Sequence, residues 1–349
     1  IGTQLEAEPR PVYSQDVIFD ADLSAFVGDR KGSLLYTIPP EGVVIFQPLD
    51  GNRRWRCQVV VGDEHLISEA AVSERIRAAL GTEDDVGIKI TSMRMWQPTP
   101  GCVTKFATGR VFLAGDAAHI SVPTGGMGNN TGFAGIRNLA WKLAYVVRGL
   151  ASASILGTYE IEHRPIAVER IAFGVSTTDH MGRMMLGHRS GVDVSEHIQA
   201  THQYADYDHV LLGFEMTSDL IAPDLEPAPE LDDPAADFTP LVRSGRRAPH
   251  VWVDAAETES VLDWFGSSYV LLLGSACSAD PWRSVIAEGA GDVQVVVRQF
   301  PAGRSASPYS DDEVVLVRPD GVIAARRTIG DAVSDVADVL RYLPSSAAS

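Results

Sequence analysis

Near the start of the chain, hydrophobic residues fall in short runs that are separated by turn-forming residues. The three runs, and the two breaker segments between them, are residues 33–38, 43–49 and 55–61, and residues 39–42 and 50–52. Short β-prone runs between proline, glycine and asparagine are typical of antiparallel strands joined by tight turns. A polar helical pattern over residues 68–80 and another strand pattern near 88–95 follow. We therefore predict a sheet-rich unit over residues 1–105.

After residue 105 the pattern changes to a single strand, a glycine-rich segment and a long helix. Residues 110–114 are a compact apolar run, which predicts a buried strand. From Gly132 to Arg148, apolar residues recur at intervals of three and four, which predicts an amphipathic helix. Lys142 suits the negative end of that helix, and Gly149 suits the position just after it.

A second helical pattern begins near Ser154 and meets Pro165, which is tolerated in the first turn of a helix. We expect the helix to be interrupted there and to resume from the proline. These helices and the preceding loop make up a predicted segment of residues 106–221.

Residues 222–240 contain five prolines and six acidic residues but no basic residue. Such a composition neither packs well nor forms a regular element, so we predict an acidic linker between domains. Beyond it, four β-prone runs alternate with helical patterns and predict a small α/β domain over residues 241–349. The runs are residues 251–253, 269–273, 293–298 and 314–318.

Composition narrows the possible partners. The chain has 349 residues, and its 46 acidic against 29 basic side chains give a formal charge of -17. This charge repels phosphates and anionic lipids, so we expect neither nucleic-acid nor membrane binding. Its apolar runs are shorter than the roughly 20 residues that span a bilayer. The three cysteines have no zinc or disulfide spacing, which predicts no metal site and favours a reducing cytoplasm.

The residues with the clearest chemical signal follow the strand predicted at 110–114. Gly115-Asp116 places a carboxylate at the end of that strand, where α/β proteins bind ligands and where it could hold a ribose-like hydroxyl. Gly125, Gly126 and Gly128 precede the long helix, whose unpaired N–H groups favour an anionic ring or a phosphate. Taken alone, such a glycine cluster is more often a simple turn.

The whole ordered string is more specific. Its three parts are residues 109–119, 123–132 and 138–143. In this order they resemble the second flavin-contacting motif of FAD-dependent aromatic hydroxylases, the single-component flavoprotein monooxygenases that act on phenols, chlorophenols and polyketides. Resemblance to this family extends to further segments: residues 16–22, 28–36, 159–165, 247–253 and 315–321. The last two resemble the thioredoxin-like C-terminal domain of the larger members.

The resemblance implies a mixed α/β fold: part of an FAD/NAD(P)-binding fold, an antiparallel substrate-domain sheet and a thioredoxin-like domain. It implies that Asp116 bonds the ribityl chain of FAD and that Pro123 lies beside the flavin ring. The residues expected to surround the cofactor are Gly115, Asp116, Pro123, Gly125, Gly126, Gly128, Asn130 and Thr131. His119 belongs to the same string, and we expect it to satisfy backbone groups rather than to transfer protons.

The chain also departs from the family pattern. It has no Gly-x-Gly-x-x-Gly for the pyrophosphate of FAD and begins with Ile, which suggests the C-terminal part of a longer protein. Ala134-Gly135 replaces a common Gln-Asp pair, and His163 replaces a common arginine. Cys277 stands alone where a thioredoxin has two cysteines, so we expect an idle thiol rather than dithiol chemistry.

The function that the resemblance implies is hydroxylation of a phenolic or polycyclic, polyketide-like substrate by FAD, NADPH and O2 through a flavin C4a-hydroperoxide. The predicted substrate wall comprises Phe46, Pro48, Arg54, Trp55, Arg56 and Trp96. Alternation places Arg54 and Arg56 on one face of a strand and Trp55 on the other, and leaves open which face meets the flavin. Arginines in such a pattern are more often a solvated face than substrate anchors.

Two alternatives remain at this point: an inactive scaffold that interacts through the thioredoxin-like domain, and a flavoprotein oxidase that inserts no oxygen. A homodimer is compatible with the resemblance. No catalytic residue is predicted, because the cofactor carries the difficult step.

Overall fold

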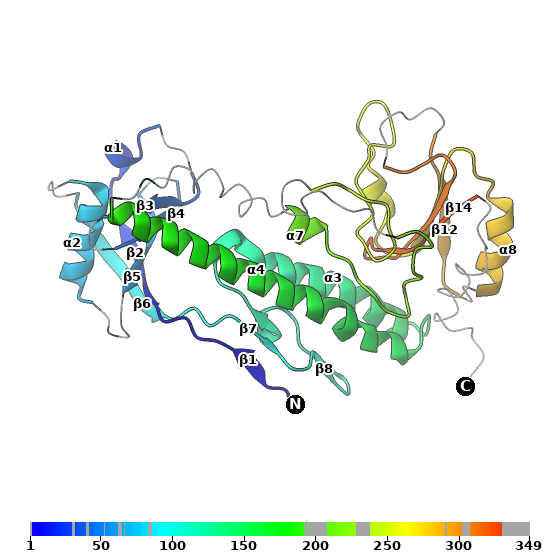
Figure 1. Cartoon of the computed structure of the whole chain (residues 1–349), viewed down its shortest axis with the longest axis horizontal. Helices are drawn as coiled ribbons and strands as arrows, with labels where there is room; N and C mark the ends of the chain where they lie inside the picture. Colours follow the sequence, from blue (N-terminus) through cyan, green and yellow to red (C-terminus); the bar gives the residue numbers. More distant parts are fainter. Residues whose placement is uncertain are drawn as a thin grey trace. The chain divides into compact units, whose positions relative to one another are not determined.

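The computed structural model describes residues 2–329 except 30–31, 40–41, 52, 62–64, 66, 83–85, 192, 194–207, 228–237, 290–291 and 302–307. The chain divides into two compact units. The sheet unit contains Ala7–Gly101 and Gly174–Ala200, and the larger unit contains Ile1–Glu6, Cys102–Phe173 and Thr201–Ser349. Figure 1 shows the elements of both units in sequence colours. The segment predicted at 106–221 thus lies mostly in the same compact unit as the C-terminal domain.

The sheet unit is built on a five-stranded antiparallel sheet with the order β3-β4-β5-β2-β6. Its strands are β2 (Tyr13–Asp20), β3 (Leu35–Thr37), β4 (Val44–Pro48), β5 (Arg54–Val61) and β6 (Lys89–Trp96). The predicted meander is confirmed, because Phe46 pairs with Leu35 on one side and with Cys57 on the other. The sequence pattern did not predict β2, which lies between β5 and β6.

One face of this sheet is a hydrophobic core. Trp55, Cys57 and Val59 are buried on β5, whereas Arg54 and Arg56 lie on the opposite face, so the predicted alternation is confirmed. Helix α2 (Glu69–Leu80) contributes buried apolar side chains to the core. Its N-cap is Ser68, whose Oγ accepts a hydrogen bond from the backbone N–H of Ala71 at 3.2 Å. The short helix α1 (Ser24–Val27) completes the described helices of residues 7–101.

Short β-elements precede the helices of the larger unit. Strands β1 (Leu5–Ala7), β7 (Gly101–Val103) and β10 (His119–Ile120) form a three-stranded sheet, and β8 (Ala107–Thr108) pairs with β9 (Val111–Phe112). The buried strand predicted at 110–114 is therefore wrong. Only two of its residues pair, they pair only with β8, and Val111 is 48% exposed. Asp116 follows in a single 3-10 turn, η1 (Gly115–Ala117).

Two long helices, α3 (Met127–Val147) and α4 (Thr158–Arg189), come next. Helix α3 begins five residues before the predicted start at Gly132. The 3-10 turns η2 (Thr124–Gly126) and η3 (Ala153–Gly157) lead into α3 and α4. Pro165 does not interrupt α4, which is one continuous helix (Figure 1). The predicted break is wrong because buried Glu162 and Ile166 anchor the helix on both sides of the proline.

The C-terminal part of the larger unit is a four-stranded mixed sheet with the order β12-β11-β13-β14. Its elements are β11 (Tyr269–Leu273), α8 (Asp280–Gly289), β12 (Val295–Gln299), β13 (Glu313–Val317) and β14 (Ile323–Thr328), with the short helices α7 (Asp208–Leu212) and η4 (Val261–Trp264) before them. The strand at 269–273 is confirmed, but 251–253 is reduced to one bridge from Trp252 to Ser260. Residues 228–237 of the predicted linker lie outside the described residues.

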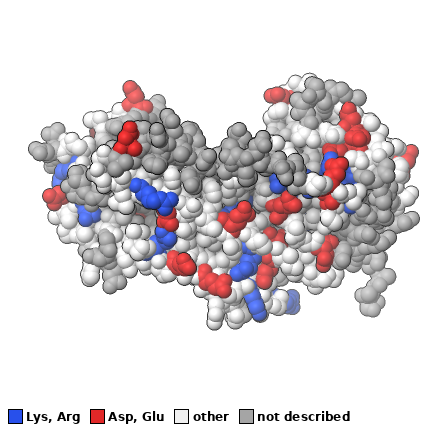
Figure 2. Space-filling view, in the orientation of Figure 1, with Lys and Arg blue, Asp and Glu red and all other residues white. Residues whose placement is uncertain are grey.

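Cys277 is a buried free cysteine, and its Sγ donates to the carbonyl oxygen of Glu313 at 3.3 Å. Burial raises the pKa of this thiol, which makes it a poor nucleophile. Among the described residues, no helix combines the length and the apolar character needed to cross a membrane. Figure 2 shows acidic and basic side chains interspersed on one face, without a continuous basic area on its described part.

Candidate functional site

The predicted carboxylate of Asp116 is exposed to solvent. Gly115 adopts φ +57°, and the N–H of Ala118 donates to its carbonyl oxygen at 2.8 Å, which closes the turn and leaves Asp116 exposed. A Cβ at Gly132 would lie 3.4 Å from the Cα of Gly115, so this turn packs directly on α3. No described residue donates a hydrogen bond to the Asp116 carboxylate, which is therefore available to a ligand hydroxyl.

No side chain caps the first N–H groups of α3, and two glycines shape the turn that leads into the helix. Gly125 (φ +80°) and Gly126 (φ +63°) both adopt positive φ, which side chains other than glycine rarely tolerate. Gly126 is the N-cap and makes no side-chain cap hydrogen bond. With the positive end of the helix dipole, these N–H groups favour an electron-rich or anionic group.

The remaining predicted cofactor residues differ in accessibility. Pro123 and Asn130 are exposed, and the Asn130 Nδ2 donates to the carbonyl oxygen of Gly126 at 3.0 Å. Thr131 is fully buried, and its Oγ1 donates to the carbonyl oxygen of Met127 at 2.7 Å. This hydrogen bond argues against direct contact of the Thr131 side chain with a ligand.

His119 does not play the expected backbone-bonding role. It is fully buried, and neither ring nitrogen has a hydrogen-bond partner among the described residues. Instead the ring lies 6.2 Å from the Phe106 ring and 5.7 Å from the His163 ring, centroid to centroid. Burial lowers the pKa of His119, so the imidazole is neutral and acts as part of an aromatic cluster.

Two positions that depart from the family pattern, Gly135 and His163, pack against each other in the structure. A Cβ at Gly135 would lie only 2.4 Å from the Nε2 of His163, so the imidazole occupies the space that a side chain at 135 would need. Burial, reinforced by His119, lowers the pKa of His163 to about 3. Glycine at 135 and histidine at 163 are therefore one packing arrangement, which the two positions considered separately did not reveal.

The six predicted substrate residues fall on two faces of the sheet. Phe46 and Trp55 are buried in the core, and Pro48 pairs directly with Trp55. The other face carries Arg54, Arg56 and Trp96. Because the sheet separates the two groups, only the second can line a site on the open face.

That open face has fixed polar geometry around Asp16. The guanidinium of Arg56 donates to the Asp16 Oδ2 from Nη2 at 2.7 Å and from Nε at 3.1 Å, and its Nη1 donates to the Gln47 Oε1 at 3.2 Å. The Trp96 Nε1 donates to the Asp16 Oδ1 at 3.3 Å. Arg56 is therefore held in position rather than freely solvated.

A buried ionic cluster of Lys142, Glu162, Arg318 and Asp320 was missed by the sequence pattern. Glu162 Oε2 lies 2.8 Å from Lys142 Nζ, and Glu162 Oε1 lies 2.8 Å from Arg318 Nη1. Arg318 Nη2 also lies 2.5 Å from Asp320 Oδ2, which accepts a hydrogen bond from the Trp141 Nε1 at 3.0 Å. The side chains of Lys142, Glu162 and Arg318 are completely inaccessible to solvent.

Charges inside this cluster stabilise one another. Burial opposes ionisation of Glu162, but Arg318 and Lys142 outweigh it and hold the pKa of Glu162 far below its usual range. Burial lowers the pKa of Lys142 to about 8, partly offset by Glu162. We expected Lys142 to interact with the negative end of the helix dipole. This prediction is wrong, because Lys142 is buried and bonds Glu162. The cluster joins α3, α4 and the C-terminal domain within the larger unit.

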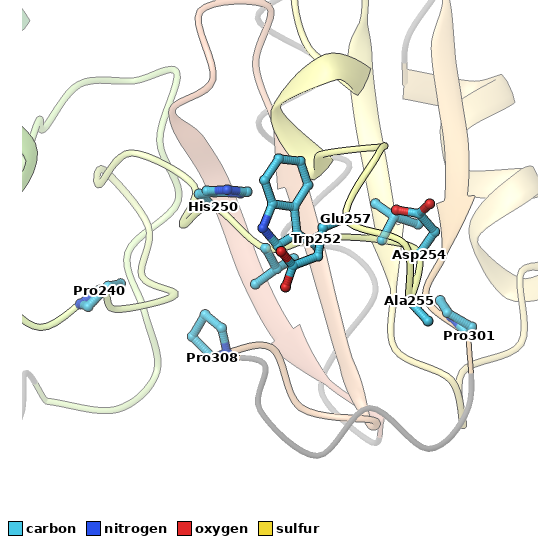
Figure 3. A pocket seen from close by; sticks show the side chains of 10 residues that line it. Pro240, His250, Trp252, Asp254, Ala255, Glu257, Pro301 and Pro308 are labelled. Atoms are coloured by element: carbon cyan, nitrogen blue, oxygen red, sulfur yellow. The ribbon is translucent and has the colours of Figure 1, made fainter.

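A wide depression of about 1130 Å³ lies in the C-terminal domain (Figure 3). His250 and Trp252 lie side by side there, with ring centroids 4.7 Å apart, among prolines and the carboxylates of Asp254 and Glu257. None of the predicted cofactor or substrate residues lines this depression.

Comparison with known proteins agrees with this arrangement. Residues 1–173 match the FAD binding domain family, and residues 241–344 match the family of the aromatic-ring hydroxylase C-terminal domain. The chain is 31% identical over 332 residues to a putative polyketide hydroxylase of Streptomyces halstedii, which covers 87% of this chain and 57% of that protein. It is 33% identical over 346 residues to aklavinone 12-hydroxylase RdmE of Streptomyces purpurascens, which covers 93% and 61%.

Among solved structures, the flavin-dependent monooxygenase PieE in complex with FAD and substrate superposes with a TM-score of 0.82 at 25% identity. The match covers 98% of this chain and 67% of that one. The chain spans about 57% and 61% of the length of the two curated relatives. A flavin-binding segment and a hydroxylase C-terminal domain in one chain define a class of flavoprotein. The chain contains an FAD binding domain and the C-terminal domain of aromatic-ring hydroxylases.

Proposed function

We propose that this chain supplies the flavin loop and the substrate sheet of a monooxygenase that uses FAD, NADPH and O2. Its substrate would be a phenolic or polycyclic, polyketide-like aromatic compound. One observation carries the proposal: the Asp116 carboxylate is exposed and without a hydrogen-bond donor, on a turn packed against the uncapped start of α3. A hydroxyl group of a cofactor would donate a hydrogen bond to the Asp116 carboxylate. An anionic acceptor group of the same cofactor would accept from the first N–H groups of α3.

The residues present fit FAD. Asp116 would accept a hydrogen bond from a ribityl hydroxyl, and exposed Pro123 would lie against the ring. The first N–H groups of α3 would face the pyrimidine edge, where reduced flavin carries negative charge. Bound FAD supplies the redox chemistry that activates O2 with electrons from NADPH. We propose that a segment outside these 349 residues holds the pyrophosphate, since they contain no Gly-x-Gly-x-x-Gly.

The task of the protein is then to orient the substrate ring and to exclude water. The open face of the sheet unit offers suitable anchors, because Asp16 and Gln47 hold the guanidinium of Arg56 in one orientation. A fixed guanidinium can stabilise a phenolate oxygen by a charge-assisted hydrogen bond. We propose Arg54, Arg56 and Trp96 as substrate-binding residues.

The buried ionic cluster speaks against the scaffold alternative. The C-terminal domain is not an appended module, because Arg318 reaches Glu162 at 2.8 Å and Asp320 accepts from Trp141 on the flavin-loop helix. A separate interaction module would not need fully buried charges shared with α3 and α4.

The test is product analysis with the complete gene product, NADPH and a panel of phenols and polycyclic quinones under ¹⁸O₂. The proposal expects a product that carries one ¹⁸O atom for each NADPH consumed. NADPH consumption that yields only hydrogen peroxide with every substrate would contradict it and support the oxidase alternative.

A second readout addresses the substrate face. Arg54→Ala and Arg56→Ala should raise KM about tenfold or more while flavin content stays constant, because each removes a charged anchor. Lys89→Ala, an exposed change on the edge strand β6, is the matched control. Loss of flavin from both arginine variants would show that the substrate face has been misassigned.

A further inference from the structure

A second cavity, of about 310 Å³, lies entirely within the larger unit. Its walls come from α3, from residues 211–216 and from the C-terminal domain, and none of its residues belongs to the predicted flavin site. The lining residues are Phe133, Ala134, Arg137, Asn138, Leu211, Phe214, Met216, Arg247, Leu262, Phe265, Asp320, Gly321 and Val322.

Most of the wall is apolar and aromatic. Phe133, Phe214 and Phe265 supply three rings, and Phe133 is 69% exposed. Aromatic walls favour a planar, apolar ligand body. A volume of about 310 Å³ is at the lower end of small-molecule pockets, which limits that body to one or two fused rings.

Two arginines give the cavity its charge. Arg137 lies one helical turn after Phe133, so both share one face of α3. A Cβ at Gly321 would lie 3.3 Å from the Nη2 of Arg137 and 3.6 Å from the Phe265 ring, so both side chains approach Gly321. Arg247 is half-buried, and its pKa is lowered by burial and, next, by the charge of Arg137.

These two charges are not compensated by the described residues around them. Neither guanidinium forms an ion pair or a side-chain hydrogen bond with a described residue. Asp320 lines the cavity, but its carboxylate is occupied by Arg318 at 2.5 Å and by the Trp141 Nε1 at 3.0 Å. Two cations and two carboxylates balance within the buried ionic cluster, which leaves Arg137 and Arg247 in excess although the protein has a net charge of -17.

We propose that this cavity binds an aromatic carboxylate of one or two fused rings. The carboxylate lies between Arg137 and Arg247, where it relieves their mutual repulsion and accepts charge-assisted hydrogen bonds. The ring packs against Phe214 and Phe265. The depression of Figure 3 is a useful contrast, since among the described residues carboxylates but no lysine or arginine line it. The site does not depend on the proposed function.

The experiment is a fluorescence titration of the 349-residue chain with 2-naphthoate. We expect saturable binding that is about tenfold weaker in Arg137→Gln and in Arg247→Gln, since each removes one charge-assisted hydrogen bond. Arg148→Gln, an exposed change at the other end of α3, should leave the affinity unchanged. The uncharged analogue 2-naphthalenemethanol should bind at least about tenfold more weakly.

Several results would overturn the proposal. These are no saturable binding to the wild-type chain, equal affinity in the wild type and Arg137→Gln, or displacement by inorganic phosphate as effective as by benzoate. Arg137 is exposed, so its variant remains a valid test even if Arg247→Gln fails to fold. Saturating FAD should not compete with 2-naphthoate, and competition would mean that the cavity is part of the flavin site. Because the titration needs no flavin, its failure is distinguishable from failure of the proposed function.

Discussion

The first turn of α3 and the middle of the same helix differ in how their polar groups are hydrogen-bonded. At the first turn, Gly126 provides no side-chain cap and the neighbouring Asp116 carboxylate has no described hydrogen-bond donor. In the middle, Asn138 and Lys142 are buried, and both bond Glu162, at 2.6 Å and 2.8 Å. Polar groups at the first turn therefore remain available to a ligand, whereas those in the middle of the helix bond other groups of the protein.

This difference separates binding from folding. Buried polar groups must be paired because an unpaired one costs the desolvation free energy of that group. Exposed groups on a rigid turn need no such partner and can be kept for a ligand. Substitutions in the middle of α3 and its partners should therefore change stability, whereas substitutions at its first turn should change flavin affinity.

The largest effect is expected from Glu162→Gln. The change leaves buried Lys142 without a carboxylate and leaves Arg318 with Asp320 alone, which should lower the free energy of unfolding by about 3–5 kcal/mol. Urea unfolding followed by tryptophan fluorescence measures it. Glu6→Gln is the matched control, because Glu6 is 66% exposed and pairs with Arg164 on the surface. Its effect should stay within about 1 kcal/mol, and equal losses in both variants would refute the distinction.

A pH effect should follow from the buried histidines His119 and His163. The pKa of His163 is lowered by burial to about 3 and that of His119 is lowered too, so the unfolded chain binds more protons below pH 6.5. Stability is therefore complete above pH 6.5 and falls as the pH decreases, by at most about 1.4 kcal/mol per pH unit for each histidine.

The measurement is the urea midpoint between pH 7.5 and pH 5. His163→Gln should flatten this dependence, because it removes one of the two titrating groups. His250→Gln, at an exposed histidine of the C-terminal domain, should leave the dependence as it is. A wild-type midpoint that stays constant over this range would mean that the two imidazoles are not buried in neutral form.

A smaller effect is expected from Gly126→Ala. The residue adopts φ +63° with open space around it, so the strain of a Cβ should cost only about 1 kcal/mol of stability. Flavin affinity should fall more than stability does, because the N–H groups of the first turn would be displaced. Gly81→Ala, which places the same strain at the C-cap of α2, controls for backbone strain. Similar flavin affinity in both variants would contradict a cofactor role for this turn.

Local patterns predicted the parts of the fold that are local. The antiparallel meander follows from breakers at 39–42 and 50–52, and α2 from the polar helical pattern over residues 68–80. The start of α3 was placed too late because Asn130 and Thr131 are typical of turns. In the structure both side chains bond helix carbonyls one turn earlier, and these bonds let the helix begin at Met127.

Long-range charge pairing could not be predicted in this way. Glu162 and Arg318 are 156 positions apart, and nothing near either residue indicates the other. Lys142 carried one weak signal, since it shares helical spacing with the apolar residues Leu139 and Val146. Strand β14 was missed because Arg326 and Arg327 interrupt its apolar pattern, although Arg326 pairs with Glu313 at 2.7 Å. The two faces of the five-stranded sheet were predicted as alternatives, and burial assigned Trp55 to the core face.

The most direct test of the central claim is a visible absorption titration of the 349-residue chain with FAD, in the wild type and in Asp116→Ala. We expect saturable binding with a perturbed flavin band, about tenfold weaker in the variant because one charge-assisted hydrogen bond is lost, with an unchanged urea midpoint. Asp219→Ala, at an exposed carboxylate of the same unit, should bind FAD like the wild type. Absence of flavin binding by the wild-type chain, or equal affinity in Asp116→Ala, would contradict the claim that this loop is a preformed flavin site.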